Sequence, residues 1–156
     1  MTTGLSERLD RIIGCVKGNI GISSLYTLYE LMLDCKYTKN IYCPGNDIDK
    51  ETIADYYINI EDIKEMIGRG IVHYLYSNVI NGKIRCDLTI EDPVSLRRKD
   101  CINIADITFK ELEEIGIIKA GKYFIIILKN LDDIARKFEE EYGIPSKFVY
   151  ETIKAT

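Results

Sequence analysis

Apolar side chains recur every three or four positions along much of the chain, for example at Leu5, Leu9, Ile12 and Val16. This spacing gathers them on one face of an α-helix, with Ser6 as a cap for its first turn. On the same basis we expect seven helices, over residues 5–17, 24–35, 49–57, 61–67, 108–115, 131–142 and 146–154. Residues 36–49, which contain a Pro-Gly pair, are expected to form a loop.

Glycine-bearing turns between apolar stretches predict two β-hairpins. The first turn is Asn81-Gly82, and an Asn-Gly pair between alternating segments is one of the strongest short signals for a hairpin. The second turn is Ala120-Gly121. Together with the helices, these hairpins predict an α+β fold. We expect strands at residues 71–76, 83–90, 102–104, 117–118 and 123–128.

Two stretches of the chain repeat one order of features: an amphipathic helix, a glycine stop, an apolar pair, and a Gly-Lys turn before a strand. The first stretch has helix 61–67, Gly68-Arg69-Gly70, Ile71-Val72 and Gly82-Lys83, and the second has helix 109–115, Gly116, Ile117-Ile118 and Gly121-Lys122. This order resembles the last half of a winged helix-turn-helix module, in which a two-stranded wing follows a recognition helix. The resemblance extends over about residues 20–90 and 96–128, and it implies winged-helix-like α-β-β units with flanking helices, two of them in tandem.

Residues 92–100 are the best candidate for a linker, because they combine Pro93 with a run of three basic residues. We therefore divide the chain into a first helical and hairpin unit, residues 1–92, and a second helix–hairpin unit with a C-terminal helix pair, residues 93–156. One compact domain is the alternative, since 156 residues suit either one domain or two very small ones.

The distribution of charge limits how such units could contact DNA. The chain carries a net charge of −4, and its two candidate recognition helices bear carboxylates such as Glu65 and Glu113, which phosphates repel. The C-terminal helix pair also resembles a helix-turn-helix, although its first helix is one turn longer than that family expects. Its second helix offers polar and basic side chains. The candidate DNA contacts are Arg97, Arg98, Lys99, Lys119, Lys122, Lys147, Tyr150 and Lys154.

Tyrosines crowd the first third of the chain and indicate a protein interface as an alternative, because exposed tyrosines are enriched at interfaces. Tyr26, Tyr29, Tyr37 and Tyr42 are the candidate partner contacts, and Tyr56 and Tyr57 continue the cluster. Two functions stay open. One is a non-enzymatic binding module in transcription or another DNA transaction, and the other is a protein adaptor or a subunit of a larger complex, such as a viral accessory protein.

The five cysteines include no Cys-x-x-Cys pair, and His73 is the only histidine. A structural zinc site usually needs four close-spaced ligands, so buried free thiols are the expected state. A Cys35–Cys43 disulfide is the alternative, as intracellular disulfides occur in hyperthermophiles. The absence of glutamine is a feature of heat-adapted proteins, and the many isoleucines and tyrosines are typical of an AT-rich genome.

Catalytic and targeting motifs are absent from the sequence. It has no phosphate-binding glycine loop and no activated serine or cysteine, so we expect neither enzymatic activity nor a cofactor. Asp87 and Glu91, at the end of an expected strand, are the least poor candidates for a metal site. The N-terminus shows no signal peptide, and the longest apolar run is far shorter than the roughly 20 residues of a membrane span. We therefore expect a cytoplasmic protein.

Overall fold

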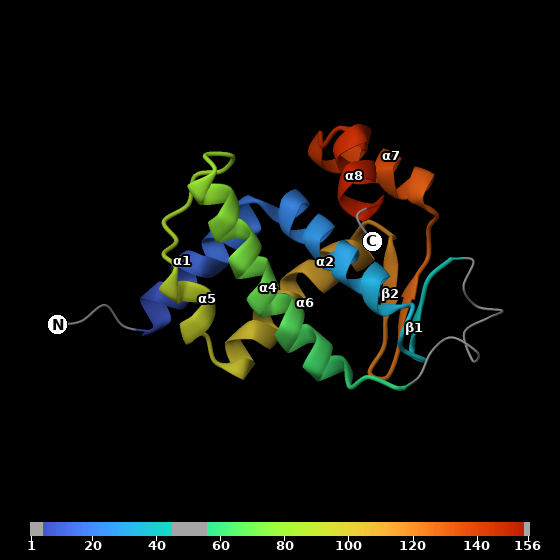
Figure 1. Cartoon of the computed structure of the whole chain (residues 1–156), viewed down its shortest axis with the longest axis horizontal. Coiled ribbons are helices and arrows are strands. Elements are labelled where there is room, and N and C mark those ends of the chain that lie inside the picture. The colour runs from blue at the N-terminus through green and yellow to red at the C-terminus, as the bar shows by residue number, and fades with distance from the viewer. Residues whose placement is uncertain (1–4, 45–55, 155–156) are drawn as a thin grey trace.

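The computed structural model describes residues 5–44 and 56–154. Two long helices, α4 and α6, pack against each other at the centre, and a small sheet lies at one end of them (Figure 1). The helices are α1 (Leu5–Gly18), α2 (Ile20–Asp34), α4 (Ile60–Ile80), α5 (Glu91–Ser95), α6 (Arg98–Glu114), α7 (Leu131–Tyr142) and α8 (Ser146–Lys154). The strands are β1 (Ile41–Tyr42), β2 (Ile118–Ala120) and β3 (Ile125–Ile127).

These elements confirm the α+β class. Among the described residues, no helix is both long and apolar enough to cross a membrane. Buried side chains form one cluster that includes Ile63 and Leu75 on one side of the expected boundary at residue 92, and Ile104 and Phe138 on the other. The division into units 1–92 and 93–156 stays a prediction.

Helix α4 continues through Gly68 and Gly70, where the sequence predicted a stop. The reason is its crossing with α6. A Cβ on Gly68 would overlap the carbonyl oxygen of Cys101 and lie 2.6 Å from the carbonyl carbon, so this glycine lets the two helix backbones approach closely. The expected strand 71–76 is therefore the second half of α4, with Ile71 and Leu75 fully buried.

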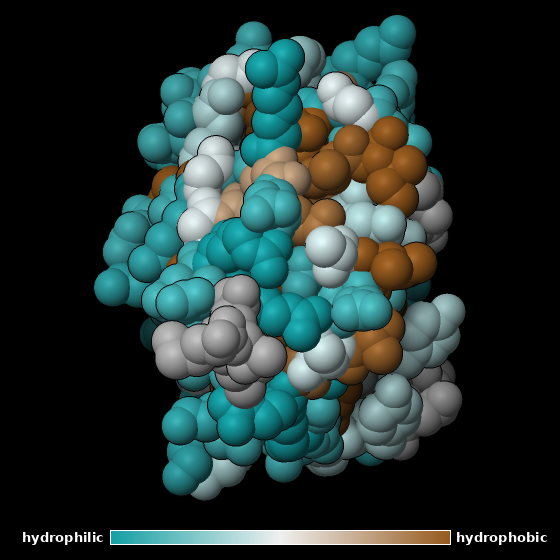
Figure 2. All heavy atoms as spheres, turned by 90° about the vertical axis from the view of Figure 1, so that its left-hand side faces the viewer, coloured by the Kyte–Doolittle hydropathy of each residue, from teal (hydrophilic) through white to brown (hydrophobic). Residues whose placement is uncertain are grey.

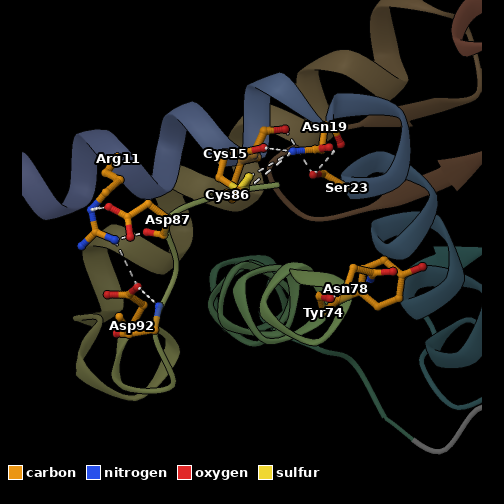
Figure 3. The surroundings of a disulfide bond; sticks show 11 residues. Arg11, Cys15, Asn19, Ser23, Tyr74, Asn78, Cys86, Asp87 and Asp92 are labelled. Atoms are coloured by element: carbon orange, nitrogen blue, oxygen red, sulfur yellow. Dashed lines mark hydrogen bonds and ion pairs between the residues drawn. A yellow bond between two sulfur atoms is a disulfide. The ribbon is translucent and has the colours of Figure 1, made fainter. Parts of the chain in front are cut away.

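The pair Asn81-Gly82 ends helix α4 and does not form a hairpin turn. Gly82 has φ +72°, and its N–H bonds the carbonyl of Val79, which is a typical helix end. The predicted strand 83–90 is also wrong, since residues 83–89 have no regular structure and α5 follows them. A disulfide between Cys15 and Cys86 holds this segment against α1 (Figure 3).

Polar contacts add to that disulfide. The amide of Asn19 donates to the carbonyl oxygen of Cys15 at 3.0 Å and reaches the sulfur of Cys86 at 3.3 Å. One turn earlier in α1, Arg11 points toward Asp87 and Asp92 (Figure 3). These hydrogen bonds and ion pairs, together with the disulfide, hold the segment after α4 in place. In a hairpin, backbone hydrogen bonds between two strands would do so.

The expected linker 92–100 is mostly helical, because α5 and the start of α6 occupy it. Asp92 is fully buried there, where its carboxylate accepts from Arg8 at 2.6 Å and from the Thr89 N–H at 2.7 Å. The neighbouring Arg8 and Arg11 guanidinium groups and these hydrogen bonds outweigh the opposing effect of burial and lower the pKa of Asp92. This region fixes the chain between α4 and α6.

Two helix caps assigned from the sequence are wrong. Helix α2 begins at Ile20, and Ser23 and Ser24 are buried inside it. Thr108 lies in the middle of α6, where Thr27 donates to its hydroxyl oxygen at 2.8 Å, and the expected strand 102–104 belongs to the same helix. The hydroxyls of Ser23 and Thr108 donate instead to backbone carbonyls inside the helices, Ser23 to Asn19 at 2.8 Å and Thr108 to Ala105 at 3.0 Å.

The second glycine-bearing segment folds as predicted. Gly116 has φ +78° and ends α6, and β2 and β3 then form an antiparallel hairpin. Strand β1, in the expected loop 36–49, adds to the other side of β3 in parallel, which gives the order β1-β3-β2. The C-terminal helices 131–142 and 146–154 are confirmed, with Gly143 in the left-handed conformation after α7.

The remaining differences concern helix 49–57 and the cysteines. Most of that helix lies outside the described residues, but Tyr56 forms a parallel bridge with Thr38. The expectation of free thiols is wrong for four cysteines: Cys35–Cys43 is a disulfide, and Cys15–Cys86 is a second one whose partners are 71 positions apart. Only Cys101 is free and buried.

Candidate functional site

The hairpin turn and the start of α4 enclose a groove of about 410 Å³. We call it the hairpin-tip groove. Three segments that are distant in sequence meet there: the residues before β1, those before α4, and the β2–β3 turn. A volume of this order is typical of a site for a small molecule or a single residue of a polymer. The groove is lined by Asn40, Tyr57, Ile58, Asn59, Ile60, Glu61, Lys122 and Tyr123.

Asn40 joins the three segments. Its side chain is buried, and its amide donates to the carbonyl oxygens of Ile58 at 2.8 Å and Tyr123 at 2.9 Å. Its side-chain oxygen accepts from the Ile58 N–H at 3.0 Å, and its backbone carbonyl accepts from the Ile125 N–H at 2.9 Å. Because one side chain bonds both walls, the backbones next to Tyr57 and at Tyr123 are held at a fixed separation.

Two tyrosine rings stand exposed at this groove. Tyr57 is 73% exposed and Tyr123 is 72% exposed, although large aromatic side chains are usually buried. Each ring has a lysine ammonium over one of its faces, with Lys39 Nζ 5.9 Å from the Tyr57 centroid and Lys122 Nζ 5.4 Å from the Tyr123 centroid. The groove thus presents aromatic faces next to positive charge.

Electrostatics at the groove are mixed. Asn59 caps α4 by accepting from the Glu61 N–H at 2.8 Å, so the partly positive end of a 21-residue helix points here. The carboxylate of Glu61 opposes that charge. Because the helix end and the Glu61 carboxylate act in opposite directions, the charges of Lys39 and Lys122 determine whether the groove attracts an anion.

The basic cluster at the start of α6 is largely neutralised. Arg98 forms ion pairs with Asp62 at 2.8 Å and with Glu65, and hydrogen bonds to these two carboxylates raise its pKa further. Arg97 bonds Asp100 at 3.3 Å, whereas Lys99 is exposed. Most of the positive charge in the predicted contact Arg97–Lys99 is thus already paired within the protein.

The C-terminal candidates lie among carboxylates. Lys147 is 4.0 Å from Glu151, the hydroxyl of Tyr150 donates to Asp132, and Lys154 lies 5.4 Å from the Tyr150 ring centroid. This arrangement gives a mixed surface. Lys119 is exposed on β2 and Lys122 is in the groove, so these two candidates share the hairpin.

The predicted partner tyrosines separate into two groups. Tyr26 stacks on Tyr74 with ring centroids 5.0 Å apart and is 6.3 Å from Tyr29, and both Tyr26 and Tyr29 pack partly buried against the core. Tyr37 is 55% exposed, next to the bridge that Thr38 forms, and Tyr42 is half-buried in β1. Tyr37, the exposed one of these four tyrosines, is thus close in sequence to Asn40 of the groove.

A second group of titratable side chains lies on α2. Burial, followed by the neighbouring Glu30 carboxylate, raises the pKa of Asp34 to about 6. Burial also raises the pKa of Glu30 and, together with that carboxylate, the pKa of Tyr26. Among the residues that the structure describes, no group of three or more His, Cys, Asp or Glu side chains could hold a metal ion, and the pair Asp87/Glu91 belongs to no such group.

Comparison with known proteins identifies no relative. No family model, no curated protein and no solved structure matches this chain.

Some residues of the hairpin-tip groove follow from the sequence, and others do not. Lys122 was predicted from the wing, and Tyr57 belonged to the noted tyrosine cluster. Tyr123 falls in an expected strand, and nothing in its neighbourhood indicates exposure apart from its position beside a turn lysine. Asn40 of the groove and its neighbour Lys39 fall in the expected loop 36–49, because the two-residue strand after them leaves almost no periodic signal.

Proposed function

We propose that this protein is a non-enzymatic nucleic-acid-binding module that acts in transcription or another DNA transaction through its hairpin-tip groove. The observation that carries the proposal is the pair of exposed rings, Tyr57 and Tyr123, each with a lysine beside it. Aromatic faces beside positive charge are the usual elements of a nucleic-acid site, since rings stack on bases and lysines contact phosphates.

The helix–hairpin order supports a winged-helix-like interpretation for the second unit. Helix α6 ends at Glu114, two residues before Gly116, and the β2–β3 hairpin that follows would be the wing, with Lys122 in its turn. The acidic residues and internal ion pairs of α4 and α6 argue against contact by these helices. The wing and the groove beside it are the better contact. Lys39 and Lys122 lie over tyrosine rings, and among the described residues neither forms an ion pair with a carboxylate.

Fluorescence anisotropy with a labelled oligonucleotide at low salt tests this proposal. Binding should weaken as salt rises, because each phosphate contact releases counterions. The variant Lys39→Glu/Lys122→Glu should lose binding. The matched control Lys147→Glu/Lys154→Glu makes the same change in net charge on the C-terminal helices and should retain most of it. No binding by the wild type at low salt, or equal loss in both variants, would contradict the proposal.

A protein adaptor is the second candidate, and exposed apolar side chains favour it. Ile80, Ile90 and Val94 are 64%, 68% and 72% exposed. They lie at the end of α4, before α5 and within α5. Figure 2 shows the face of the molecule on which α1 and α5 lie, and hydrophobic side chains gather along one side of that face. Exposed apolar patches often mark protein contacts.

A pull-down with purified tagged protein separates the two candidates. An adaptor should retain a specific partner that Ile90→Asp/Val94→Asp loses and that Lys39→Glu/Lys122→Glu keeps. An unchanged set of bound proteins in the first variant would count against the adaptor.

A further inference from the structure

We propose that the hairpin-tip groove selects single-stranded nucleic acid by stacking unpaired bases on Tyr57 and Tyr123. This inference rests on the proposed nucleic-acid-binding function and names the form of the ligand. It is carried by the exposure of both rings, by the hydrogen bonds of the buried Asn40 side chain to the backbone of Ile58 and Tyr123, and by the size of the groove between these segments.

The two rings come from separate segments with fixed backbones. Tyr57 directly precedes Ile58, which exchanges two hydrogen bonds with the side chain of Asn40, and the carbonyl of Tyr123 accepts a third. The backbone beneath each ring is therefore ordered before a ligand arrives. A ligand that stacks on such rings loses little further conformational freedom of the protein.

The charges near the rings suit a strand whose bases have turned toward the protein. Lys39 and Lys122 lie within 6 Å of the two ring centroids, so a phosphate linked to a stacked base would come near an ammonium group. Glu61, on the wall of the groove, could accept a hydrogen bond from the imino N3–H of an unpaired thymine or from an exocyclic amine of another base. Phosphates would bind at the lysines and away from Glu61.

A duplex fits this surface less well. Its bases are already stacked and offer no free face to a tyrosine, and its phosphates would depend on Lys39 and Lys122 at the groove of a chain whose net charge is −4. A single strand, in contrast, can add the energy of stacking to that of charge. The geometry therefore favours single strands over duplex of the same sequence.

The experiment measures anisotropy with three labelled probes: oligothymidine, the duplex it forms with its complement, and an abasic strand of equal length. The variants are Tyr57→Leu/Tyr123→Leu, which removes the rings and keeps apolar side chains, and Tyr57→Phe/Tyr123→Phe, which keeps the rings. Both tyrosines are exposed, so neither variant should disturb the fold, and circular dichroism checks this.

Wild-type protein should bind the single strand about tenfold or more tightly than the duplex or the abasic strand. The leucine variant should lose that preference, and the phenylalanine variant should keep it. Equal affinity for all three probes, unchanged in the leucine variant, would overturn this inference and leave the charge-based function in place. No binding of any probe would overturn the proposed function itself.

Discussion

Two segments with the same order of sequence features fold differently in this protein. Residues 60–80 form one helix that passes through Gly68 and Gly70, whereas residues 109–127 form the end of a helix, a glycine stop and a hairpin. Gly68 has helical backbone and lies against the carbonyl of Cys101, but Gly116 has φ +78° with only the end of the Lys129 side chain near it. One glycine permits close packing, and the other permits a turn.

The two segments also differ in location, because the first lies in the core and the second reaches the surface. The first segment supplies Ile63, Ile67 and Ile71 to the core, and its chain continues to the Cys15–Cys86 disulfide. The second presents Lys122 and Tyr123 at the tip of its hairpin. A glycine in a helical pattern therefore does not predict whether its segment will be buried or exposed. The outcome depends on whether another element packs against that glycine.

The largest expected effect is that of Gly68→Ala. The added Cβ would overlap the backbone of Cys101, which cannot rotate away, so α4 and α6 would have to separate. We expect the free energy of unfolding to fall by about 4 kcal/mol or more, as overpacking against a backbone is among the most destabilising changes. Urea denaturation measures it. The control Gly14→Ala has no atom within 4 Å of its new Cβ and should raise stability by about 0.5 kcal/mol.

The second largest expected loss of stability follows from removal of the Cys15–Cys86 disulfide. Cys15→Ala/Cys86→Ala frees residues 83–90, which have no sheet partner, and reopens a connection that spans 71 residues. We expect a loss of about 2–4 kcal/mol, and faster amide exchange after α4 than in the hairpin. The pair Cys35→Ala/Cys43→Ala spans only 8 residues and should cost less. An equal cost for both pairs would contradict this explanation.

The two glycines that end helices should behave alike. Gly116→Ala and Gly82→Ala each place a side chain at positive φ, with no close neighbour in either case. We expect each to cost about 1–2 kcal/mol, the usual penalty of the left-handed conformation. Thermal unfolding measures both. A cost at Gly116 several times that at Gly82 would show that the hairpin, and not the backbone angle, sets the requirement.

The smallest expected effect concerns the ion pair between Lys64 of α4 and Asp106 of α6, which are 2.7 Å apart. Because both side chains are partly exposed, Asp106→Asn should lower stability by about 0.5 kcal/mol, and the difference should shrink at high salt. Denaturation curves at two salt concentrations check this. A loss close to that of Gly68→Ala would mean that charge, and not close backbone packing, holds α4 against α6.

The sequence predicted those elements whose signals are local. Gly116, the hairpin after it, and the C-terminal pair with Gly143 follow from residues a few positions apart. The same local rules predicted a stop at Gly68 and a hairpin at Asn81-Gly82, and both were wrong. The deciding contact, Gly68 with Cys101, joins residues 33 positions apart in the numbering, which no local pattern contains.

The residues of the hairpin-tip groove were likewise predictable only where their signals are local. Lys122 in the hairpin turn and the tyrosine cluster near residue 57 are visible in the sequence. The role of Asn40 depends on Ile58 and Tyr123, from two other segments, and could not be predicted. The basic candidates Arg97 and Arg98 look available in sequence, but they have carboxylate partners in the fold.

Amide chemical shifts during titration of the ¹⁵N-labelled protein with oligothymidine test most directly where ligand binds. We predict perturbations concentrated in residues 38–42, 56–61 and 120–125, which surround the hairpin-tip groove. Perturbations concentrated on α7 and α8, or on the exposed face of α6, with none at the hairpin turn, would contradict the account.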